Sequence, residues 1–343
     1  MNVIVTGGCG FIGCHVIREL LNNDNFGMIF NIDLLTYSGN LQNLESIKEN
    51  ERYRLIKGSI NDKELMMSVI TENNINVIIN LAAESHVDRS INSAKKFIET
   101  NIDGTRNILE CMRDLQDSVD LFLLHVSTDE VYGSLSKDDL PFTEDTPIQP
   151  MNPYAVTKAA SDMLVQAFVN THKIKACISR CSNNYGPNQF PEKLIPLMII
   201  NCKGNKELPI YGDGLQIRDW IHVTDHAKGI IMMIEGFFED KVKSGEVINF
   251  GADNEITNIE IVKQIIKLTE GDENQIKYVR DRPGHDKRYA MRYDKANKKL
   301  GWSPKISWTV GIKETVEWYL SNDQWVESIK SGEYLEWIKT HYN

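Results

Sequence analysis

The sequence predicts an α/β fold, in which a doubly wound parallel sheet is joined to a smaller mixed α/β lobe. Short, nearly continuous apolar runs alternate with helical patterns through the first half, which is typical of parallel strands covered on both faces. A glycine-rich turn stands between the first apolar run and the first helical pattern. After Tyr185 the pattern becomes irregular and Gly and Pro recur, which favours a loop-rich second lobe.

The elements of the first half follow in a regular order. Expected strands cover Val3–Val5, Met28–Ile32, Val77–Leu81, Leu121–Val126 and Ala176–Ser179. Expected helices cover Phe11–Leu21, Leu65–Thr71, Ala94–Leu115 and Tyr154–Thr171. No repeat or long linker interrupts them, so we expect one continuous body. We divide the chain into domains 1–184 and 185–343, with crossings of the chain between the lobes allowed.

Composition excludes several classes of protein. A formal net charge of -10 over 343 residues leaves no basic surplus to neutralise nucleic-acid phosphates. The short basic run at Lys295–Lys299 is typical of a solvated helix face. No apolar stretch reaches the roughly 18 residues of a membrane span, and the N-terminus does not resemble a cleavable leader. We therefore expect a cytoplasmic protein without a nucleic-acid or membrane partner.

The six cysteines do not form a metal-binding or disulfide pattern. They are Cys9, Cys14, Cys111, Cys177, Cys181 and Cys202, without a Cys-x-x-Cys pair or an accompanying His cluster. We expect structural, reduced thiols and no metal site.

A phosphate-binding loop is predicted at Thr6–Gly13. Gly7, Gly10 and Gly13 permit a tight turn and a close approach of backbone to pyrophosphate, and the following helix offers free N–H groups. Glycine turns also occur for structural reasons alone, but this one lies between a strand and a helix. Asp33 ends the second expected strand, where a carboxylate accepts ribose hydroxyls and repels a 2′-phosphate. These features predict a Rossmann-type domain that binds NAD rather than NADP, and the glycine spacing resembles the extended short-chain dehydrogenase/reductase family.

Tyr154 and Lys158 are predicted to transfer a proton. Their spacing of four places both side chains on one face of a helix. A free tyrosine has a pKa near 10, and a neighbouring ammonium would lower it, so that the phenolate can take a hydroxyl proton. The motif is common by chance and gains its meaning from the dinucleotide loop upstream.

Thr128, Asp129 and Glu130 follow the strand Leu121–Val126, at the edge where ligands bind to open α/β sheets. An acidic surface turn is the alternative interpretation. Oxidation at C4 of a hexose makes the C5 proton acidic; removing that proton needs a base, and expelling the C6 hydroxyl needs an acid. Two carboxyl groups in different protonation states meet both needs.

The motifs together resemble those of dTDP-glucose 4,6-dehydratases over nearly the whole chain. The resemblance is found in the segments Thr6–Gly13, Leu81–Ser90, Ser127–Gly133, Tyr154–Lys158, Arg180–Pro187, Pro191–Pro196, Tyr211–Trp220 and Asp281–Asp286. It implies conversion of dTDP-glucose to a 4-keto-6-deoxy sugar for deoxysugar biosynthesis, of which rhamnose is one possible end. The sequence does not identify the pathway.

The resemblance also implies a role for each matched position. Tyr154, assisted by Lys158, would be the base for C4 oxidation, and Thr128 would orient the C4 hydroxyl. Asp129 would protonate the departing C6 hydroxyl, and Glu130 would remove the C5 proton. The residues implied to bind NAD are Gly7, Gly10, Phe11, Ile12, Gly13, Asp33, Ser59, Ile60, Leu81, Ala82, Ala83, Thr100, Tyr154, Lys158 and Asn184. Those implied to bind the nucleotide-sugar are Ser85, Thr128, Asn183, Lys193, Leu194, Pro209, Tyr211, Arg218, Asn254, Arg282 and His285.

Arg218 and Arg282 suit a pyrophosphate, since a guanidinium can donate two parallel hydrogen bonds; surface ion pairs are the alternative. Ser59-Ile60 departs from the Asp-Ile of many relatives, so the contact with adenine would carry no charge. The resemblance implies a homodimer built on the helices Ala94–Leu115 and Tyr154–Thr171.

Other functions stay open at this point. UDP-glucose 4,6-dehydratases share most of the motifs. A 4-epimerase needs Tyr and Lys but no carboxylate pair, and decarboxylases and GDP-mannose dehydratases usually carry Ser-Glu where this chain has Asp129-Glu130. A regulator that binds NAD without turnover is the alternative from another class, but Tyr154 and Lys158 are both present.

Overall fold

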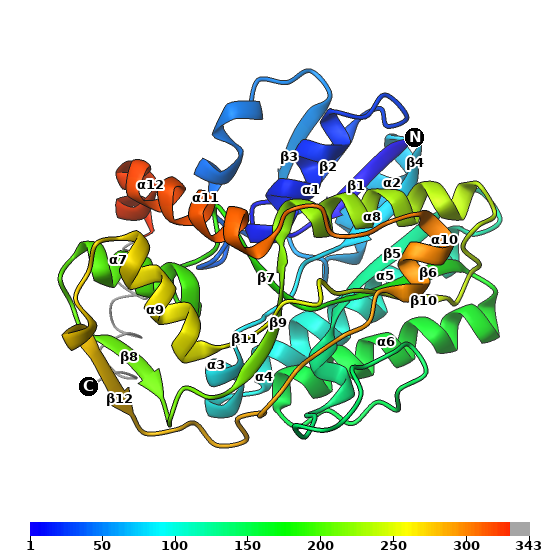
Figure 1. The fold of residues 1–343 in the computed structure, drawn as a ribbon. Coiled ribbons are helices and arrows are strands. Elements are labelled where there is room, and N and C mark those ends of the chain that lie inside the picture. The colour runs from blue at the N-terminus through cyan, green and yellow to red at the C-terminus, as the bar shows by residue number, and fades with distance from the viewer. Residues whose placement is uncertain (330–343) are drawn as a thin grey trace.

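A seven-stranded sheet, parallel throughout, forms the larger lobe (Figure 1). The computed structural model describes residues 1–329, so the end of the expected second domain, 330–343, lies outside the described residues. Across the sheet the strands are β10 (Val247–Phe250), β6 (Lys175–Cys181), β5 (Phe122–Thr128), β4 (Ile75–Asn80), β1 (Asn2–Thr6), β2 (Ile29–Asp33) and β3 (Tyr53–Lys57). The strand order reverses between β1 and β4, which confirms the predicted Rossmann-type, doubly wound sheet.

Both faces of this sheet are covered by helices, because successive strand residues point to opposite faces. Val3 and Val5 of β1 pack in one core, and Ile4 between them packs in the other. The first core is closed by α1 (Phe11–Leu21), α8 (Val223–Phe238) and α10 (Asp294–Leu300). The second core is closed by α2 (Lys63–Glu72), α5 (Gly104–Leu115) and α6 (Pro153–His172).

The smaller lobe is mixed α/β, as predicted. It contains the sheet β11 (Glu255–Thr257), β9 (Ile217–His222) and β7 (Asn183–Tyr185), and the pair β12 (Ile276–Val279) and β8 (Leu208–Tyr211). Its core is closed by α7 (Leu194–Lys203), α9 (Asn258–Leu268), α11 (Trp308–Ser321) and α12 (Asp323–Ser328). After α8 the chain returns to the large sheet at β10, so the two lobes exchange segments.

Most expected elements agree with the structure to within a few residues. The remaining short elements are η1 (Leu41–Ile47), α3 (Val87–Asn92), α4 (Lys95–Phe97), η2 (Ile98–Asp103), η3 (Asp129–Tyr132) and η4 (Glu273–Gln275).

The expected single helix Ala94–Leu115 is wrong in its middle, where η2 is a π-helical turn between α4 and α5.

The π-helical turn coincides with tertiary hydrogen bonds to Asn101. The Asn101 side chain donates to the Glu84 carbonyl (3.0 Å) and to the Thr157 hydroxyl (2.9 Å), and Ser161 donates to the Asn101 carbonyl (2.6 Å). These partners compete with the regular i to i−4 ladder, and hydrophobic periodicity cannot reveal that competition.

The side-chain chemistry agrees with the expectations from composition where it can be tested. All six cysteines are free and buried, which confirms that they are structural thiols. Burial raises the pKa of the Cys9 thiol to about 12, so this residue of the glycine turn stays protonated. Within residues 1–329, none of the helices is both long and apolar enough to cross a membrane.

A buried ion pair joins β5, β6 and α6. Arg180 Nε donates to Asp162 Oδ2 (2.9 Å), and the Arg180 guanidinium lies over the Tyr132 ring (4.7 Å). His125 Nε2 lies 3.5 Å from Asp162 Oδ1, and burial lowers the pKa of His125 well below its usual range. Removal of Asp162 would therefore leave the Arg180 charge buried without its carboxylate.

We predict that Asp162→Ala lowers the free energy of unfolding by about 3–5 kcal/mol, because it leaves the Arg180 guanidinium buried without its carboxylate partner. Urea unfolding followed by circular dichroism measures the change. Asp114→Ala is the control, since Asp114 pairs with Lys63 and Arg113 on the surface, where an ion pair contributes little. Equal effects of the two substitutions would contradict the assigned importance of the buried pair.

Candidate active site

One cavity of about 450 Å³ lies along the carboxyl edge of the large sheet and continues between the lobes. Apart from Asn254, it is lined by every residue that the sequence predicted for catalysis, cofactor binding or substrate binding. Asn254 instead forms hydrogen bonds with β9 of the smaller sheet. Its N–H donates to Asp219 Oδ1 (2.8 Å), and its side chain donates to the Trp220 carbonyl (3.2 Å). Asn258, at the start of α9, does line the cavity.

The glycine turn forms a tight cradle at one end of the cavity. Gly7 has a φ of +69°, and a Cβ there would lie 2.8 Å from the Ala82 Cα. A Cβ on Gly13 would lie 2.4 Å from the Gly7 carbonyl oxygen. No side chain caps the N-terminus of α1, so its first N–H groups face the cavity without a side-chain acceptor. This cradle fits a pyrophosphate.

Asp33 lies beside this cradle at the end of β2. Its Oδ2 accepts a hydrogen bond from the Cys9 N–H (2.8 Å), and its Oδ1 accepts one from the Leu35 N–H (2.8 Å). Burial raises the pKa of Asp33, and these bonds oppose the shift. Each carboxylate oxygen can accept a second bond. Ser59 and Ile60 line the same end, and the Ser59 hydroxyl accepts from the Asn61 N–H (3.1 Å). The residues present therefore fit an adenine dinucleotide.

Thr128 and Asp129 meet at the junction of β5 and η3. The Thr128 hydroxyl donates to Asp129 Oδ1 (3.2 Å) and accepts from the Glu130 N–H (3.3 Å). Asp129 is 2% exposed, and its Oδ2 has no hydrogen-bond partner among the described residues. Burial, followed by the charges of Glu130 and Asp219, raises the pKa of Asp129 well above its usual range. Burial therefore favours the protonated form of this carboxyl group, which lines the cavity.

Glu130 has a different environment from Asp129. It is only partly buried, and its Oε2 accepts a hydrogen bond from the Asn152 side chain (3.1 Å). Asn152 is also the N-cap of α6, where its Oδ1 accepts from the Ala155 N–H (2.9 Å). Asp129 and Glu130 are therefore adjacent carboxyl groups in unequal environments, one buried and the other partly exposed and hydrogen-bonded.

Tyr154 and Lys158 lie one turn apart on α6, beneath the same cavity. Burial, followed by the charge of Glu130, raises the pKa of Tyr154 well above its usual range, and a hydrogen bond with Thr128 opposes the shift. The expectation that Lys158 lowers this pKa is not met in the structure. The Lys158 ammonium donates to the Val126 carbonyl (2.8 Å) instead, and burial lowers its own pKa to about 8.

Cationic and phenolic side chains from the smaller lobe line the other end of the cavity. Arg218 is buried over the Tyr289 ring (4.2 Å) and donates to the Ile217 and Asp286 carbonyls (2.8 and 2.9 Å). It is therefore not a surface ion pair. Arg282 does form an ion pair, because its Nη1 donates to Asp88 Oδ1 (3.1 Å) in the cavity wall.

The guanidinium of Arg282 has one N–H donor that the described residues do not use and that is available to a ligand. The Nε of Arg282 is buried without a hydrogen-bond partner among the described residues. Tyr211 donates to the other oxygen of Asp88 (3.1 Å), and His285 Nδ1 lies 2.6 Å from Asp281 Oδ1. Burial lowers the pKa of His285 to about 4, so its ring is neutral at pH 7. This end of the cavity is suited to a polyanion.

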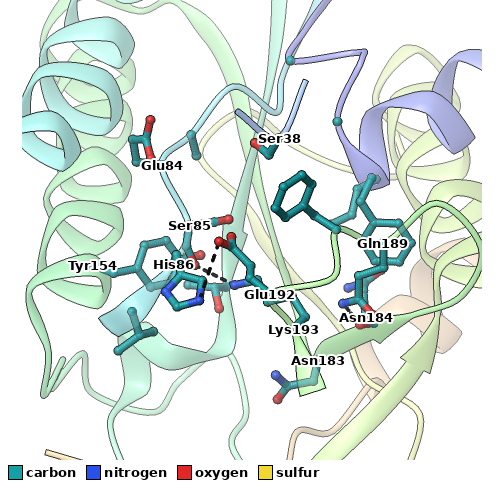
Figure 2. A pocket seen from close by; sticks show the side chains of 18 of the residues that line it. Ser38, Glu84, Ser85, His86, Tyr154, Asn183, Asn184, Gln189, Glu192 and Lys193 are labelled. Atoms are coloured by element: carbon teal, nitrogen blue, oxygen red, sulfur yellow. Dashed lines mark hydrogen bonds and ion pairs between the residues drawn. The ribbon is translucent and has the colours of Figure 1, made fainter. Parts of the chain in front are cut away.

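Lys193, the N-cap of α7, and Leu194, the first residue of that helix, line the cavity. The Lys193 ammonium donates to the Ser85 carbonyl (3.0 Å), as Figure 2 shows. Asn183 and Asn184 stand on the facing side of the cavity in the same view. The side-chain oxygen of Asn184 lies 3.0 Å from His226 Nδ1.

Several residues of the cavity were not predicted from the sequence, and Glu192 and Tyr289 are among them. Glu192 stands directly before Lys193, within a motif that had been recognised, and Tyr289 lies three residues after Asp286. Their closeness in sequence to those motifs is the signal that could have identified them as cavity residues. No cluster of three or more His, Cys, Asp or Glu side chains suited to a metal occurs within residues 1–329.

The chain is similar to known proteins over nearly its whole length. The family described as GDP-mannose 4,6 dehydratase matches residues 4–315. A dTDP-glucose 4,6-dehydratase of Shigella flexneri is 44% identical, with 100% of this chain and 99% of that protein covered. The dTDP-glucose 4,6-dehydratase of Bacillus anthracis, crystallised with NAD, is 44% identical with a TM-score of 0.87 and covers 96% of this chain and 100% of its own. The Streptomyces venezuelae enzyme of that name, also crystallised with NAD, is 40% identical with a TM-score of 0.90 over the same shares.

The matches cover nearly the whole of this chain and of the relatives, and the motifs around the cavity lie within the matched residues. The chain therefore belongs to the dTDP-glucose 4,6-dehydratase family.

Proposed function

We propose that this protein is an NAD-dependent enzyme that converts dTDP-glucose to dTDP-4-keto-6-deoxyglucose and water. The observation that supports it most directly is that Asp129, whose pKa burial raises, lines one cavity with Glu130, Thr128 and Tyr154. A simple 4-epimerase has no use for such an acid, because it expels no hydroxyl group. The named relatives support the same chemistry.

Bound NAD supplies a positively charged nicotinamide that accepts a hydride from C4 and later returns it at C6. The glycine turn, the N-terminus of α1 and Asp33 would hold its adenosine and pyrophosphate part. Thr100, Tyr154, Lys158 and Asn184 line the cavity farther along and would complete the site.

Tyr154 would take the proton of the C4 hydroxyl, which Thr128 orients. Because burial and Glu130 hold the phenol in its protonated form, a nearby positive charge is needed before it can act as a base. The Lys158 ammonium supports the strand end through the Val126 carbonyl and lies on the same helical face. We therefore assign Lys158 a supporting role in this proton transfer.

Elimination follows from the two carboxyl groups. Glu130 removes the C5 proton, which the adjacent C4 ketone has made acidic. Asp129 gives its proton to the C6 hydroxyl, which departs as water with its bonding pair. Return of a proton to C5 from Glu130 balances the hydride delivered to C6. Tyr154 releases the proton that it took from the C4 hydroxyl to solvent, and Asp129 regains one from solvent, so the net change is the loss of one water.

The remaining lining residues would hold the dTDP-sugar. Arg218 and Arg282 would donate to the diphosphate, Lys193 and Leu194 at the start of α7 would contact the nucleotide, and Ser85 and Asn183 the sugar. Pro209, Tyr211 and His285 complete that wall, with Asn258 in place of Asn254. In this proposal residues 1–184 form the NAD-binding domain and 185–343 mainly the nucleotide-sugar domain, of a cytoplasmic enzyme in deoxysugar biosynthesis.

We predict that the purified protein turns over dTDP-glucose with a kcat/KM about tenfold or more above that for UDP-glucose, since one methyl group separates the two bases. Mass spectrometry of the 4-keto-6-deoxy product measures both rates. Preferred turnover of UDP-glucose would contradict the dTDP assignment. Absence of turnover with both sugars would favour the regulator hypothesis.

We predict that Asp129→Asn keeps the oxidation at C4 but lowers product formation about 10²-fold or more, because the C6 hydroxyl loses its acid. Reduced cofactor should accumulate, which its near-ultraviolet absorbance reports in a single-turnover experiment. Asp138→Asn, an exposed acid on the following loop, is the matched control. Unchanged turnover in Asp129→Asn would refute the assigned role.

We also propose a homodimer built on η2 and α6. Ile98, Val156 and Met163 expose 45%, 48% and 55% of their surfaces on this helix pair, although they are large and apolar. We predict that Met163→Asp shifts a dimer to monomer, because it places a charge on the proposed interface. Sedimentation velocity measures the assembly, with Phe238→Asp on α8 (47% exposed) as the control. A monomeric parent protein would contradict the proposal.

A further inference from the structure

Glu192 is a buried carboxylate that the proposed mechanism does not use. It is 5% exposed and lines the cavity from the loop between β7 and α7. Tyr37 donates to its Oε1 (3.0 Å), and Arg89 Nη2 lies 3.3 Å from its Oε2. His86 Nε2 lies 3.8 Å from the same oxygen. A buried carboxylate requires such partners, since burial alone disfavours its charge.

Lys193, the next residue, makes a second link across the cavity. Its ammonium donates to the Ser85 carbonyl (3.0 Å), so two neighbouring residues of one loop reach two neighbouring residues of another (Figure 2). We call Ser85, His86, Glu192 and Lys193 the clasp. Ser85 and Lys193 are proposed contacts of the nucleotide-sugar, so the geometry of the clasp sets where they stand.

Tyr37 forms a hydrogen bond to Glu192 of the clasp from the cofactor side of the cavity. Tyr37 follows Asp33 by four positions, in the loop that leaves the proposed ribose contact, and it does not line the cavity. The Arg89 guanidinium covers the Tyr37 ring (3.9 Å), and Phe190 meets it edge-on (5.4 Å). The Tyr37 hydroxyl is hydrogen-bonded to Glu192, so Glu192 is the direct link between this hydroxyl and the cavity.

We propose that Glu192 is a positioning residue that couples the loop beside Asp33 to the nucleotide-sugar end of the cavity, with Tyr37 behind it and Lys193 beside it. This inference rests on the proposed function. An ordered loop beside NAD would orient Glu192, and Glu192 would hold Lys193 where the nucleotide meets it. Because binding coupling is reciprocal, dTDP would also strengthen the binding of NAD.

The decisive experiment measures the affinity of the NAD-saturated protein for dTDP by isothermal titration calorimetry. Tyr37→Phe keeps the ring and removes only the hydroxyl, and we expect the Kd for dTDP to rise about 5- to 20-fold. Tyr53→Phe is the matched control: Tyr53 is also on the cofactor side, and its buried hydroxyl accepts a 2.9 Å bond from Asn31, but it has no link to the clasp. The Kd of that control should not change.

Glu192→Gln provides a second variant, which also serves if Tyr37→Phe does not fold. It retains an acceptor for Tyr37 but loses the charge that Arg89 and His86 face, so the Kd for dTDP should rise again. The double variant should show less than the product of the two single effects, since both break one link. In turnover, KM for dTDP-glucose should rise while kcat stays within about twofold, because Thr128–Glu130 are untouched.

The possible failures are distinguishable. If the parent protein binds dTDP and both variants bind it equally well, the coupling is refuted, even if the variants melt at a lower temperature. A fall in kcat without a change in Kd would also overturn it, because Glu192 would then act on the chemistry rather than on binding. If the NAD-loaded parent protein does not bind dTDP, the proposed function fails and this inference fails with it.

Discussion

The parallel direction of all seven strands in the large sheet is the constraint on which the rest of the molecule depends. Every strand ends at the same edge, so chain segments far apart in the sequence deliver their turns to one place. The glycine turn after β1, Asp33 at the end of β2 and Asp129 after β5 become neighbours of one cavity in this way. The buried Asp162–Arg180 pair fastens β5, β6 and α6 beneath that edge. A change in strand direction would scatter these groups.

Burial then gives similar side chains different chemistry. Asp129 and Glu130 are adjacent in sequence, but Asp129 is enclosed with one oxygen unbonded, while Glu130 is partly exposed and bonded to Asn152. Their unequal environments give the two neighbouring carboxyl groups the different chemistry that the proposed mechanism requires. The same burial acts on Tyr154, whose pKa rises in the structure. In the proposed mechanism, Tyr154 would therefore need a positive charge supplied on binding, and not Lys158 alone, before it could act as a base.

The cavity is completed only where the two lobes meet. Asp88 of the larger lobe receives hydrogen bonds from Tyr211 and Arg282 of the smaller lobe. The loop before α7 reaches back to Ser85 and His86 through Lys193 and Glu192. These contacts place buried charges at the boundary of the lobes, where an anionic ligand can share them. In the proposed coupling, they would connect the cofactor half with the nucleotide that binds in the other half.

The sequence by itself determined the fold class and most of the site. Alternating apolar runs predicted the doubly wound sheet, and local motifs identified Gly7, Asp33, Asp129 and Tyr154, because these features depend on residues close together in the chain. It could not place Asn254, which bonds to the β9 backbone, or the π-helical turn at Asn101, which depends on partners in α6. Tertiary structure alone decided the direction of the Tyr154 pKa and the link from Tyr37 to Glu192. Burial and hydrogen bonding between segments 155 positions apart are set by packing, and no local pattern records them.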